Sequence, residues 1–411
     1  MVDSGGRKMK TVALAGTLDS KAREYAYVKN LLEDAGLKTL IIHTGVFEAE
    51  IPADISNADV AAAAGYDIEE IIQKKDRAYA TQALSKGMEA IIPRLYEEYR
   101  FDGILSFGGT GGTSIVTPGM RALPIGVPKI MVSTVASGDV SFYVGTSDIM
   151  MYPSIVDVSG LNSLSTKIFA NAAHAMAGML NYEVKQKANK KPLIAATMFG
   201  VTTPCVDAAR EYLEKKGFEV LVFHATGTGG KTMEALINSG FFAGVLDLTT
   251  TEWCDELFGG VLAAGEHRSE AAAIKGIPQV VSVGAMDMIN FGTIDTLPEN
   301  MQNRNIYRHN PSVTLVRTTT EENRALGEKL AQKLNMAHKK TVLLLPLKGV
   351  SMIDAEGQPF YGKEEDEALF ETLKRHIDTQ KVKVIELPLH INDKKFAQKA
   401  AEILIALIEE S

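Results

Sequence analysis

The stretch KTVALAGTLDSKAREYAYVKNLLEDAGLKTLIIHTG, residues 10–45, contains a complete strand–helix–strand unit. TVALAG (11–16) is a short apolar run, the apolar residues of 17–36 recur at helical spacing until Gly36, and LKTLIIHTG predicts a second strand. Strands separated by helices favour parallel pairing, because right-handed crossover helices cover both faces of such a sheet. We therefore expect a doubly wound α/β sheet.

The same pattern continues along the chain and then restarts. FDGILSFGG (101–109) and VPKIMVSTVASG (127–138) predict further strands, and helical segments precede the first of them. A polar stretch, NYEVKQKANKKP, follows, after which a new strand–turn–helix–strand series begins. We predict a disordered leader at 1–9, an N-terminal nucleotide-binding α/β domain at 10–183 and a C-terminal α/β domain at 190–411.

The two halves echo each other in sequence. FDGILSFGGTGGT (101–113) corresponds to FFAGVLDLTTTEW (241–253), and GVPKIMVSTVASGD (126–139) corresponds to GIPQVVSVGAMDM (276–288), in the same order. An internal duplication explains this sequence similarity. The alternative is that two α/β halves share the same pattern of secondary structure. The predicted fold class is α/β, with two Rossmann-like domains built on mainly parallel sheets.

Composition and charge narrow the classes of function. The 411 residues exceed one ordinary hydrophobic core, and the formal net charge of −8 argues against nucleic acid as a partner. The only cysteines, Cys205 and Cys254, form no CxxC pair, which favours a reducing compartment. No apolar run approaches the roughly 18 to 20 residues that span a bilayer. We expect a cytoplasmic protein with neither membrane nor nucleic-acid partners.

The most informative loop follows the strand GILSF. Ligands in open α/β sheets bind outside the carboxyl ends of the strands, and here six small residues precede SIV (114–116), where a helix is expected to begin. Exposed N–H groups at a helix start, with hydroxyls beside them, bind phosphate. The motif is neither GxxxxGK[ST] nor GxGxxG, and a structural glycine turn is the alternative. The six candidates are Gly108, Gly109, Thr110, Gly111, Gly112 and Thr113.

Two other strand ends in the first half supply candidate nucleotide-binding residues. After the first strand these are Gly16, Thr17, Asp19 and Lys21, where Lys21 is expected to reach a phosphate and helix capping explains Asp19 equally well. A later loop contributes Thr134, Ser137 and Gly138, with an ordinary surface turn as the alternative. Asp139 and Asp148 are weak candidate contacts for Mg²⁺.

The second half carries a polar constellation. HATGTGGK (224–231) follows a strand and precedes TMEALINSG, an arrangement that predicts a carboxylate or phosphate at a helix start. His224, Glu252 and Arg268 are candidate catalytic residues, because together they offer a proton carrier, a carboxylate and an anion clamp. A buried histidine, a solvated glutamate and a paired arginine are the structural alternatives. The polar, loop-rich stretch 286–311 is expected to cover this pocket.

Long phrases of the chain resemble one known family. GTLDSKAREYAYVK (16–29), SFGGTGGTSIV (106–116) and GDVSFYVGTSDIMMYPSIVDVSGLNSLS (138–165) are similar to the Tm-1-like ATP-binding family, named after the tomato protein that inhibits tobamovirus RNA replication. TGTGGKTMEAL (226–236) and AGEHRSEAAAIKGIPQVVSVG (264–284) resemble the family's C-terminal domain. The resemblance covers nearly the whole chain.

The resemblance implies two α/β domains, a homodimer and ATP bound in the N-terminal domain, on loops that match residues 16–21 and 108–113. The antiviral activity belongs to the plant relative and is not carried over. We expect an ATP-binding protein, with Mg²⁺ as a candidate companion ion, that acts as a metabolic enzyme on a small phosphorylated or carboxylated metabolite. The alternative is a nucleotide-gated regulatory protein without covalent chemistry.

Overall fold

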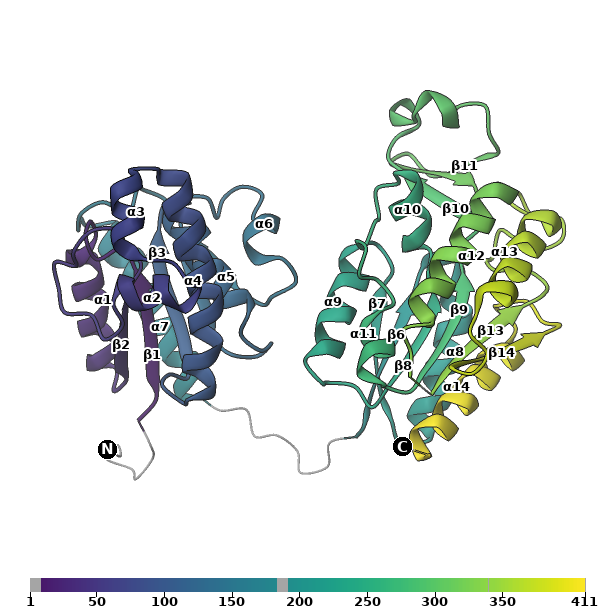
Figure 1. The fold of residues 1–411 in the computed structure, drawn as a ribbon, viewed down its shortest axis with the longest axis horizontal. Helices are drawn as coiled ribbons and strands as arrows, with labels where there is room; N and C mark the ends of the chain where they lie inside the picture. The colour runs from purple at the N-terminus through teal and green to yellow at the C-terminus, as the bar shows by residue number, and fades with distance from the viewer. Residues whose placement is uncertain (1–8, 183–190, 339, 411) are drawn as a thin grey trace. The chain divides into compact units, whose positions relative to one another are not determined.

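The computed structural model describes residues 9–182, 191–338 and 340–410. The chain divides into two compact units, Met1–Gln186 and Lys187–Ser411, here called unit 1 and unit 2. Each unit contains its own β-sheet with helices packed on it (Figure 1). Of the predicted leader at 1–9, residues 1–8 lie outside the described residues, as does the polar stretch 183–190.

Unit 1 is built on a five-stranded parallel sheet with the order β2-β1-β3-β4-β5. Its strands are β1 (Thr11–Gly16), β2 (Lys38–His43), β3 (Gly103–Gly108), β4 (Lys129–Ser133) and β5 (Met150–Pro153). β1 lies between β2 and β3, so that Ala15 pairs with Ile42 on one side and with Ser106 on the other. All six residues of β3 are buried, which is why this strand is an almost unbroken apolar run in the sequence.

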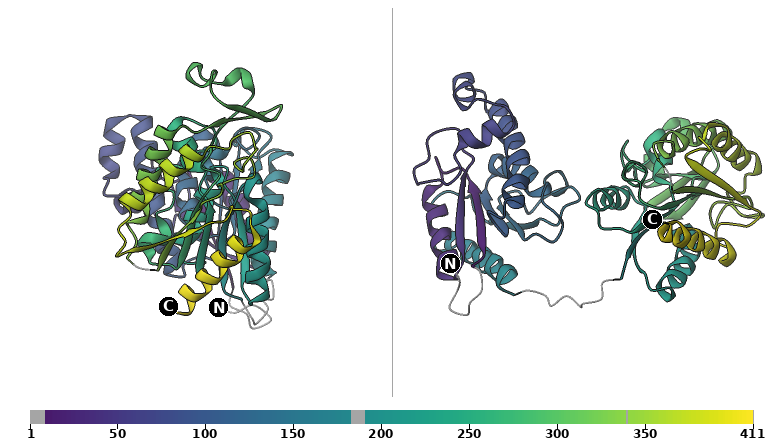
Figure 2. Two further views of the ribbon diagram at one scale, coloured as in Figure 1. Left: turned by 90° about the vertical axis from the view of Figure 1, so that its right-hand side faces the viewer. Right: turned by 60° about the horizontal axis from the view of Figure 1, so that its bottom comes forward.

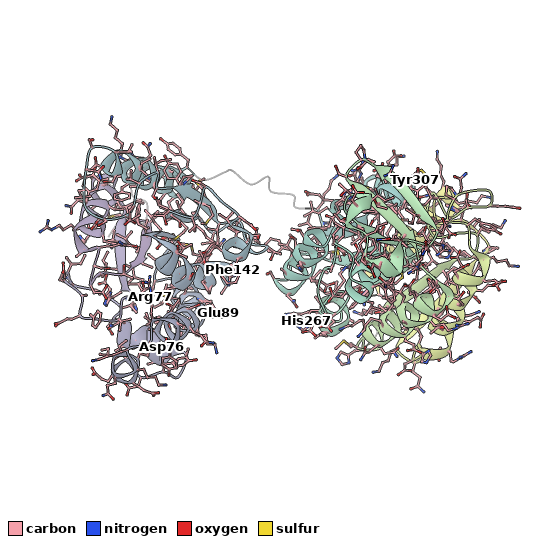
Figure 3. All side chains as sticks on the ribbon, turned by 90° about the horizontal axis from the view of Figure 1, so that it is seen from above. Asp76, Arg77, Glu89, Phe142, His267 and Tyr307 are labelled. Atoms are coloured by element: carbon pink, nitrogen blue, oxygen red, sulfur yellow. The ribbon has the colours of Figure 1, made fainter. Side chains whose placement is uncertain are left out.

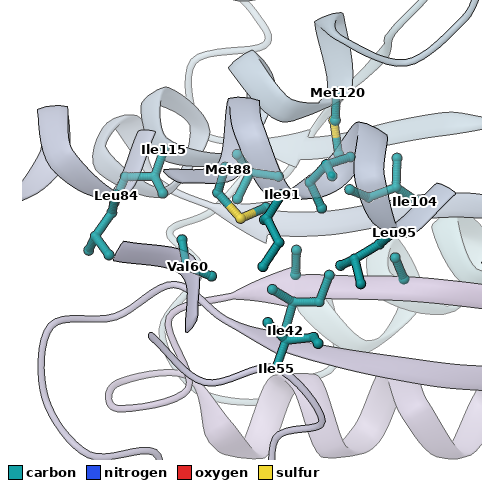
Figure 4. Close-up of a cluster of buried hydrophobic side chains, with 14 of the residues drawn as sticks. Ile42, Ile55, Val60, Leu84, Met88, Ile91, Leu95, Ile104, Ile115 and Met120 are labelled. Carbon is teal, nitrogen blue, oxygen red and sulfur yellow. The ribbon is translucent and has the colours of Figure 1, made fainter. Parts of the chain in front are cut away.

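Helices cover both faces of this sheet. They are α1 (Ala22–Asp34), α2 (Asn57–Ala63), α3 (Ile68–Lys74), α4 (Arg77–Glu97), α5 (Thr110–Arg121), α6 (Ser141–Val144) and α7 (Ser165–Asn181). On one face, Val28 of α1 and Phe169 of α7 belong to the same core cluster as Leu14 of β1. On the other face, Val60 of α2 and Met88 of α4 pack in a second core cluster, part of which is drawn in Figure 4.

The helix predicted from Ser114 begins four residues earlier. α5 starts at Thr110, with Gly109 as its N-cap, so the glycine run forms the first turn of the helix rather than a loop before it. A Cβ on Gly108 would lie only 3.2 Å from the Cα of Gly112. Glycine therefore allows the end of β3 and the start of α5 to pack closely.

Unit 2 contains a six-stranded parallel sheet with the order β14-β13-β9-β8-β6-β7 and a separate three-stranded antiparallel sheet with the order β10-β12-β11. The parallel strands are β6 (Leu193–Met198), β7 (Glu219–His224), β8 (Gly244–Thr249), β9 (Gln279–Gly284), β13 (Thr341–Pro346) and β14 (Val382–Leu387). The antiparallel strands are β10 (Met288–Phe291), β11 (Ile306–Asn310) and β12 (Val313–Arg317). The stretch 286–311, predicted to be loop-rich, thus supplies two strands of the small sheet.

The helices of unit 2 pack on both faces of its large sheet, as the two views in Figure 2 show. The α-helices are α8 (Thr203–Lys215), α9 (Thr228–Asn238), α10 (Glu252–Phe258), α11 (Ala271–Lys275), α12 (Thr320–Leu334), α13 (Lys363–His376) and α14 (Lys394–Glu409). Two of them, α8 and α14, bury Cys205, Phe396 and Leu404 on one face, while α12 and α13 bury Leu330 and Leu373 on the other. Short 3₁₀ helices occupy Gly200–Thr202, Ile294–Thr296 and Glu299–Met301.

The two units share the arrangement of their first four parallel strands. The first strand lies between the second and the third, with the fourth beside the third, in both β2-β1-β3-β4 and β7-β6-β8-β9. The registers also correspond, since Val12 pairs with Gly103 in unit 1 and Ile194 pairs with Gly244 in unit 2. The predicted fold of two Rossmann-like α/β domains with mainly parallel sheets is confirmed, and the shared strand order agrees with a duplication. No helix in the described parts of the chain combines the length and the apolar character needed to cross a membrane.

Candidate functional site

A pocket of about 790 Å³ lies in unit 1 at the carboxyl ends of β1, β2 and β3. This edge is the topological switch point of the sheet, because the chain leaves β1 and β3 toward opposite faces and opens a crevice between the two connections. The volume falls within the usual range for small-molecule sites. The carboxyl-edge residues that line it include Thr17, Thr44, Gly45, Gly109, Thr110 and Gly111.

The start of α5 forms one wall of the pocket. Thr110, Gly111 and Gly112 line it, and the first hydrogen bond of this turn runs from the N–H of Thr113 to the carbonyl of Gly109. The N–H groups of residues 110–112 therefore precede the hydrogen-bonded ladder of the helix. Such groups, together with the helix dipole, favour a bound anion.

The loop after β1 supplies a second wall. Thr17, Asp19 and Lys21, which are candidate nucleotide contacts, line the pocket. The carboxylate of Asp19 accepts the N–H of Phe47 at 3.1 Å, which fastens this loop to the one after β2. The ammonium of Lys21 donates to the carbonyl of Val158. A phosphate that used Lys21 would have to compete with that carbonyl.

Gly16 has a packing role beneath this loop rather than a place on the pocket wall. A Cβ on Gly16 would overlap the hydroxyl of Tyr25, which donates to the carbonyl of Ala15 and also contacts the carbonyl of Phe107, each at 2.8 Å. Burial raises the pKa of Tyr25 to about 12. The glycine thus makes room for a neutral tyrosine that ties β1 to β3.

Several predicted nucleotide contacts lie outside the pocket wall. Thr113 is buried, and its hydroxyl contacts that of Ser133 at 2.6 Å and donates to the carbonyl of Gly109. Gly108 lies within the buried β3. Thr134, Ser137 and Gly138 are exposed in the loop after β4, and none of them is among the pocket-lining residues. The structure therefore gathers the loops after β1, β2 and β3, but not the loop after β4.

The two aspartates considered for Mg²⁺ have structural partners instead. Asp139 accepts the N–H of Ser141 at the start of α6. Asp148 pairs with the fully buried ammonium of Lys129 at 2.5 Å and accepts the N–H of Gly126. Because Lys129 has no access to solvent, its charge requires this partner, and Asp148 is not free to bind a metal ion.

Other parts of the pocket were missed from the sequence. Arg77 begins α4, directly after the N-cap Asp76, and Figure 3, which looks onto the carboxyl edge of the sheet, labels both. Thr44 follows β2. Apolar side chains of α3, α4 and α5 form the remaining wall, and no motif marks any of these residues as a ligand contact. The apolar lining residues on these three helices are Ile71, Ile72, Ala80, Leu84 and Ile115.

In unit 2, the glycine-rich helix start is already filled by an anion of the protein itself. Oε1 of Glu252 accepts the N–H of Gly227 at 2.7 Å and that of Gly230 at 3.0 Å, in the first turn of α9. Oε2 of Glu252 accepts Nε of Arg268 at 2.7 Å. The position that we predicted for a bound carboxylate or phosphate is thus taken by an internal side chain, which is fully buried.

The guanidinium of Arg268 has no donor left for a ligand. Besides Glu252, it binds both carboxylate oxygens of Asp247, at 2.6 and 2.7 Å, and it also donates to Glu234, Ser269 and the carbonyl of Thr249. Although burial opposes its charge, these carboxylates raise the pKa of Arg268 well above its usual value. Arg268 is therefore permanently charged and fully engaged within unit 2.

His224 lies apart from this network. Its side chain is exposed, and its ring makes an edge-on contact with Phe199 at a centroid distance of 5.6 Å. The structure thus brings Glu252 and Arg268 together and leaves the imidazole outside their hydrogen bonds. A joint catalytic role for the three side chains stays a prediction.

Unit 2 contains a second buried cluster of charges. Arg317 lies 2.9 Å from Asp366 and 3.3 Å from Asp354, and Asp287 accepts the hydroxyl of Ser351 at 2.7 Å. Burial and the neighbouring carboxylates raise the pKa of Asp354 to about 10, and burial raises that of Asp287 to about 6. Asp287, predicted to lie in a covering loop, is inaccessible to solvent. Within residues 9–182, 191–338 and 340–410, no group of three or more His, Cys, Asp or Glu side chains is arranged to hold a metal ion.

Two family models match the chain in succession. Residues 10–185 match the N-terminal domain, and residues 191–408 match the C-terminal domain, of the family described as "Uncharacterised protein family (UPF0261)". A UPF0261 protein of Clostridium tetani is 54% identical over 402 residues, covering 98% of this chain and 100% of that protein. The tomato protein "ToMV resistance protein Tm-1(GCR237)" is 43% identical over 341 residues, covering 82% of this chain but 45% of that protein. The predicted resemblance is confirmed by these matches.

Likeness to solved structures is low. The UDP-GlcNAc 2-epimerase of Neisseria meningitidis, solved with UDP-GlcNAc, covers 98% of this chain at 11% identity and a TM-score of 0.25. A similarity of that size carries no argument about ligand or reaction.

Proposed function

We propose that this chain, which belongs to the UPF0261 family, binds a nucleotide, ATP, in the switch-point pocket of unit 1. One observation carries the proposal: the open first turn of α5, residues 110–112, and an apolar wall from α3 and α4 face the same cavity of about 790 Å³. The helix start suits phosphate and the apolar wall suits a base, so the pocket combines the two chemistries of a nucleotide.

The proposal assigns no reaction to unit 2. Glu252 is hydrogen-bonded to Arg268 and to the start of α9, and Arg268 is also bound to Asp247. A ligand could bind to either side chain only if these buried ionic hydrogen bonds were broken. A metabolic enzyme that uses unit 2 therefore needs residues other than these two. The alternative, in which ATP regulates the protein without covalent chemistry, requires only the pocket in unit 1.

One carboxylate on the pocket wall is available to a magnesium ion that accompanies ATP. Asp157 lines the pocket, is exposed, and makes no hydrogen bond or ion pair with the described residues. Mg²⁺ prefers oxygen ligands, usually keeps several waters and binds proteins through one or two carboxylates plus phosphates. Asp157 would hold the ion beside the phosphates, and the ion would neutralise part of their charge.

The proposal is tested by introducing into unit 1 a carboxylate at the position that Glu252 holds in unit 2. Counted from the paired glycines Gly103 and Gly244, Gly111 occupies the position that Glu252 holds in unit 2. A Cβ at Gly111 would lie 3.5 Å from Nη2 of Arg77, which is ordinary contact, so a glutamate can be built there. We expect Gly111→Glu to place a carboxylate at the start of α5 and to pair it with Arg77.

The measurement is calorimetric titration with ATP, ADP and AMP, with and without Mg²⁺. Gly111→Glu should weaken ATP binding roughly 100-fold or more, because like charges repel in a desolvated site. Gly178→Glu is the matched control, since a Cβ at Gly178 in α7 meets nothing within 4 Å. If the native protein binds none of these nucleotides, the proposal is wrong.

We also propose that the protein works as a homodimer in the cytoplasm. Its two cysteines, Cys205 and Cys254, are buried free thiols, which suits a reducing compartment. Light scattering of the purified protein gives the subunit number directly, and a monomer at micromolar concentration would rule out the dimer under those conditions.

A further inference from the structure

A second pocket of unit 1 lies at the amino ends of its strands, on the edge of the sheet opposite the switch-point pocket. Its volume is about 1020 Å³, and its wall includes residues directly before β1, β3 and β4. The last turns of α4 and α7 and the residue after α5 complete the wall. The lining residues of this amino-edge groove that carry charge or an aromatic ring are Lys10, Tyr96, Glu97, Tyr99, Phe101 and Asp102.

Three aromatic side chains contribute to the amino-edge groove. Tyr96 lies in the last turn of α4 and Phe101 shortly before β3, and their ring centroids are 5.6 Å apart with the planes tilted by 53°. Tyr99, between them in the chain, also lines the groove. Because the face of an aromatic ring carries partial negative charge, a group of such rings attracts a cation.

Tyr99 is held in a backbone conformation that a tyrosine rarely adopts. Its φ of 56° lies in the left-handed region, at the position after a helix C-cap where glycine is usual. The turn is otherwise regular, since the N–H groups of Tyr99 and Arg100 donate to the carbonyls of Tyr96 and Leu95 at 2.9 and 3.0 Å. Tyr99 is 86% exposed, so burial of its ring does not offset the strain. A strained, exposed tyrosine beside a pocket indicates a role in binding.

The charged side chains of the groove favour a cation. The carboxylate of Glu97 makes no hydrogen bond or ion pair with the described residues. Among the described lining residues Lys10 is the one cation, and its ammonium lies 3.1 Å from Oδ1 of Asp102. Two carboxylates and one ammonium leave an excess of negative charge in the groove.

The helix dipoles act in the same direction. The carboxyl ends of α4, α5 and α7 meet at this groove, and the free carbonyls of a helix end carry partial negative charge. The basic residues in the last turns of α4 and α5, Arg94 and Arg121, do not line the groove, and the last turn of α7 contains none. Arg121 instead donates to the carbonyls of Phe142 and Tyr143. The helix ends therefore add to the attraction for a positively charged ligand.

We infer that the amino-edge groove binds a small organic cation, in which an ammonium group is carried on an apolar or aromatic body. The ammonium contacts Glu97 and the ring faces of Tyr96 and Tyr99. The body of the ligand packs against apolar lining residues such as Ile125 and Met179. This inference is independent of ATP binding, because the two pockets share no lining residue.

The charge of the ligand is tested with three probes of similar shape: phenethylammonium, phenethyl alcohol and phenylacetate. Their affinities for the full-length native protein are measured by titration followed by nuclear magnetic resonance at neutral pH. We expect the cation to bind about 10-fold more tightly than the alcohol, and phenylacetate to bind most weakly, because the rings and Glu97 attract positive charge. Absence of phenethylammonium binding, or a preference for either of the other probes, overturns the inference.

The location of the site is tested by removing the free carboxylate. Glu97→Gln should weaken phenethylammonium about 3- to 10-fold and leave phenethyl alcohol unchanged. Glu98→Gln is the matched control, because it removes the same charge from the next residue, the exposed C-cap of α4, which does not line the groove. Equal effects of the two substitutions overturn the groove as the site.

Tyr99→Gly separates binding from folding. Glycine relieves the strained φ, so the melting temperature of unit 1 should rise by about 2–4 °C, while the affinity for phenethylammonium falls about 3- to 10-fold. The transition of unit 1 in calorimetry is the one that the fluorescence of Trp253, the single tryptophan, does not follow. An unchanged affinity for phenethylammonium overturns the role of Tyr99 and, with it, the cation site.

Discussion

The two glycine-rich helix starts of this protein look alike in sequence and differ in what faces them. The first turn of α5 in unit 1 lines an open pocket, whereas the first turn of α9 in unit 2 is closed by the carboxylate of Glu252. The two helices also follow different strands, since α5 follows the third strand of its unit and α9 the second. A glycine-rich helix start therefore indicates that an anion is favoured there, but not whether the anion is a ligand or a side chain.

The helix start in unit 2 is closed by a buried network of hydrogen bonds and ion pairs. Glu252 bridges two backbone N–H groups of α9 to Arg268, and Arg268 in turn binds both oxygens of Asp247 on β8. In unit 1 the position of Glu252 is Gly111 and that of Asp247 is Ser106, so neither acid is present. Arg77 lies beside Gly111, and among the residues that the structure describes no carboxylate pairs with it.

The largest effect on stability should come from removing the carboxylate of Glu252. We expect Glu252→Ala to lower the unfolding free energy of unit 2 by about 3–5 kcal/mol, because it leaves Arg268 Nε and two helix N–H groups without their buried partner. Trp253 is the only tryptophan and is buried next to this site, so its fluorescence in denaturant reports on unit 2 selectively. A loss below 1 kcal/mol would show that the network contributes little to stability.

The second test compares glycines of the two helix starts. A Cβ at Gly229 would lie 1.8 Å from the carbonyl oxygen of His224, a backbone atom that cannot turn away, and we expect Gly229→Ala to cost about 3 kcal/mol. Gly111→Ala meets only the end of Arg77 at 3.5 Å and should stabilise unit 1 by about 0.5–1 kcal/mol. Denaturation followed by circular dichroism measures both. Equal losses at the two sites would contradict the difference in packing.

The third test is the pH dependence of unit 2, where buried carboxyls have raised pKa values. Burial raises the pKa of Asp255, next to Cys254 and Trp253 along α10, to about 7. Because its folded-state pKa lies above the unfolded value of about 3.9, its contribution to stability is fully present below pH 4 and is lost as the pH rises through 7.

We expect this carboxyl to reduce the stability of unit 2 by roughly 2 kcal/mol between pH 5 and pH 7. The measurement is the unfolding free energy from Trp253 fluorescence as a function of pH, compared with Asp255→Asn, in which this contribution is absent. Asp287, with a pKa of about 6, acts in the same direction in both proteins. Identical pH slopes for native protein and variant would contradict the raised pKa.

The smallest effect is expected at His224, which precedes the closed helix start but lies outside its network. Because its side chain is exposed, His224→Ala should change the unfolding free energy of unit 2 by no more than about 0.5 kcal/mol. The same fluorescence measurement applies. A loss above 2 kcal/mol would instead assign the imidazole a structural role together with Phe199.

Much of the fold could be predicted from local patterns. The strand β1, the helix α1 and the strand β2 follow from the apolar spacing of residues 10–45, and the start of the second unit follows from the polar stretch before residue 192. These elements are encoded by neighbours within a few residues, which is why periodicity finds them. The start of α5 was placed four residues late, because a glycine run is typical of loops and gives no helical signal.

The sequence by itself determined that the chain forms two α/β units with parallel sheets and that small residues follow several strands. Only the tertiary structure decided which of these strand ends form one pocket, because that depends on the order of the strands and on helices that lie far away in the sequence. It placed Thr44 and Arg77, from the connection between β2 and β3, in the same pocket as the start of α5. It also placed Glu252 at a helix start 25 residues earlier in the chain, because a buried N–H group requires a partner and the nearest carboxylate in space supplies it.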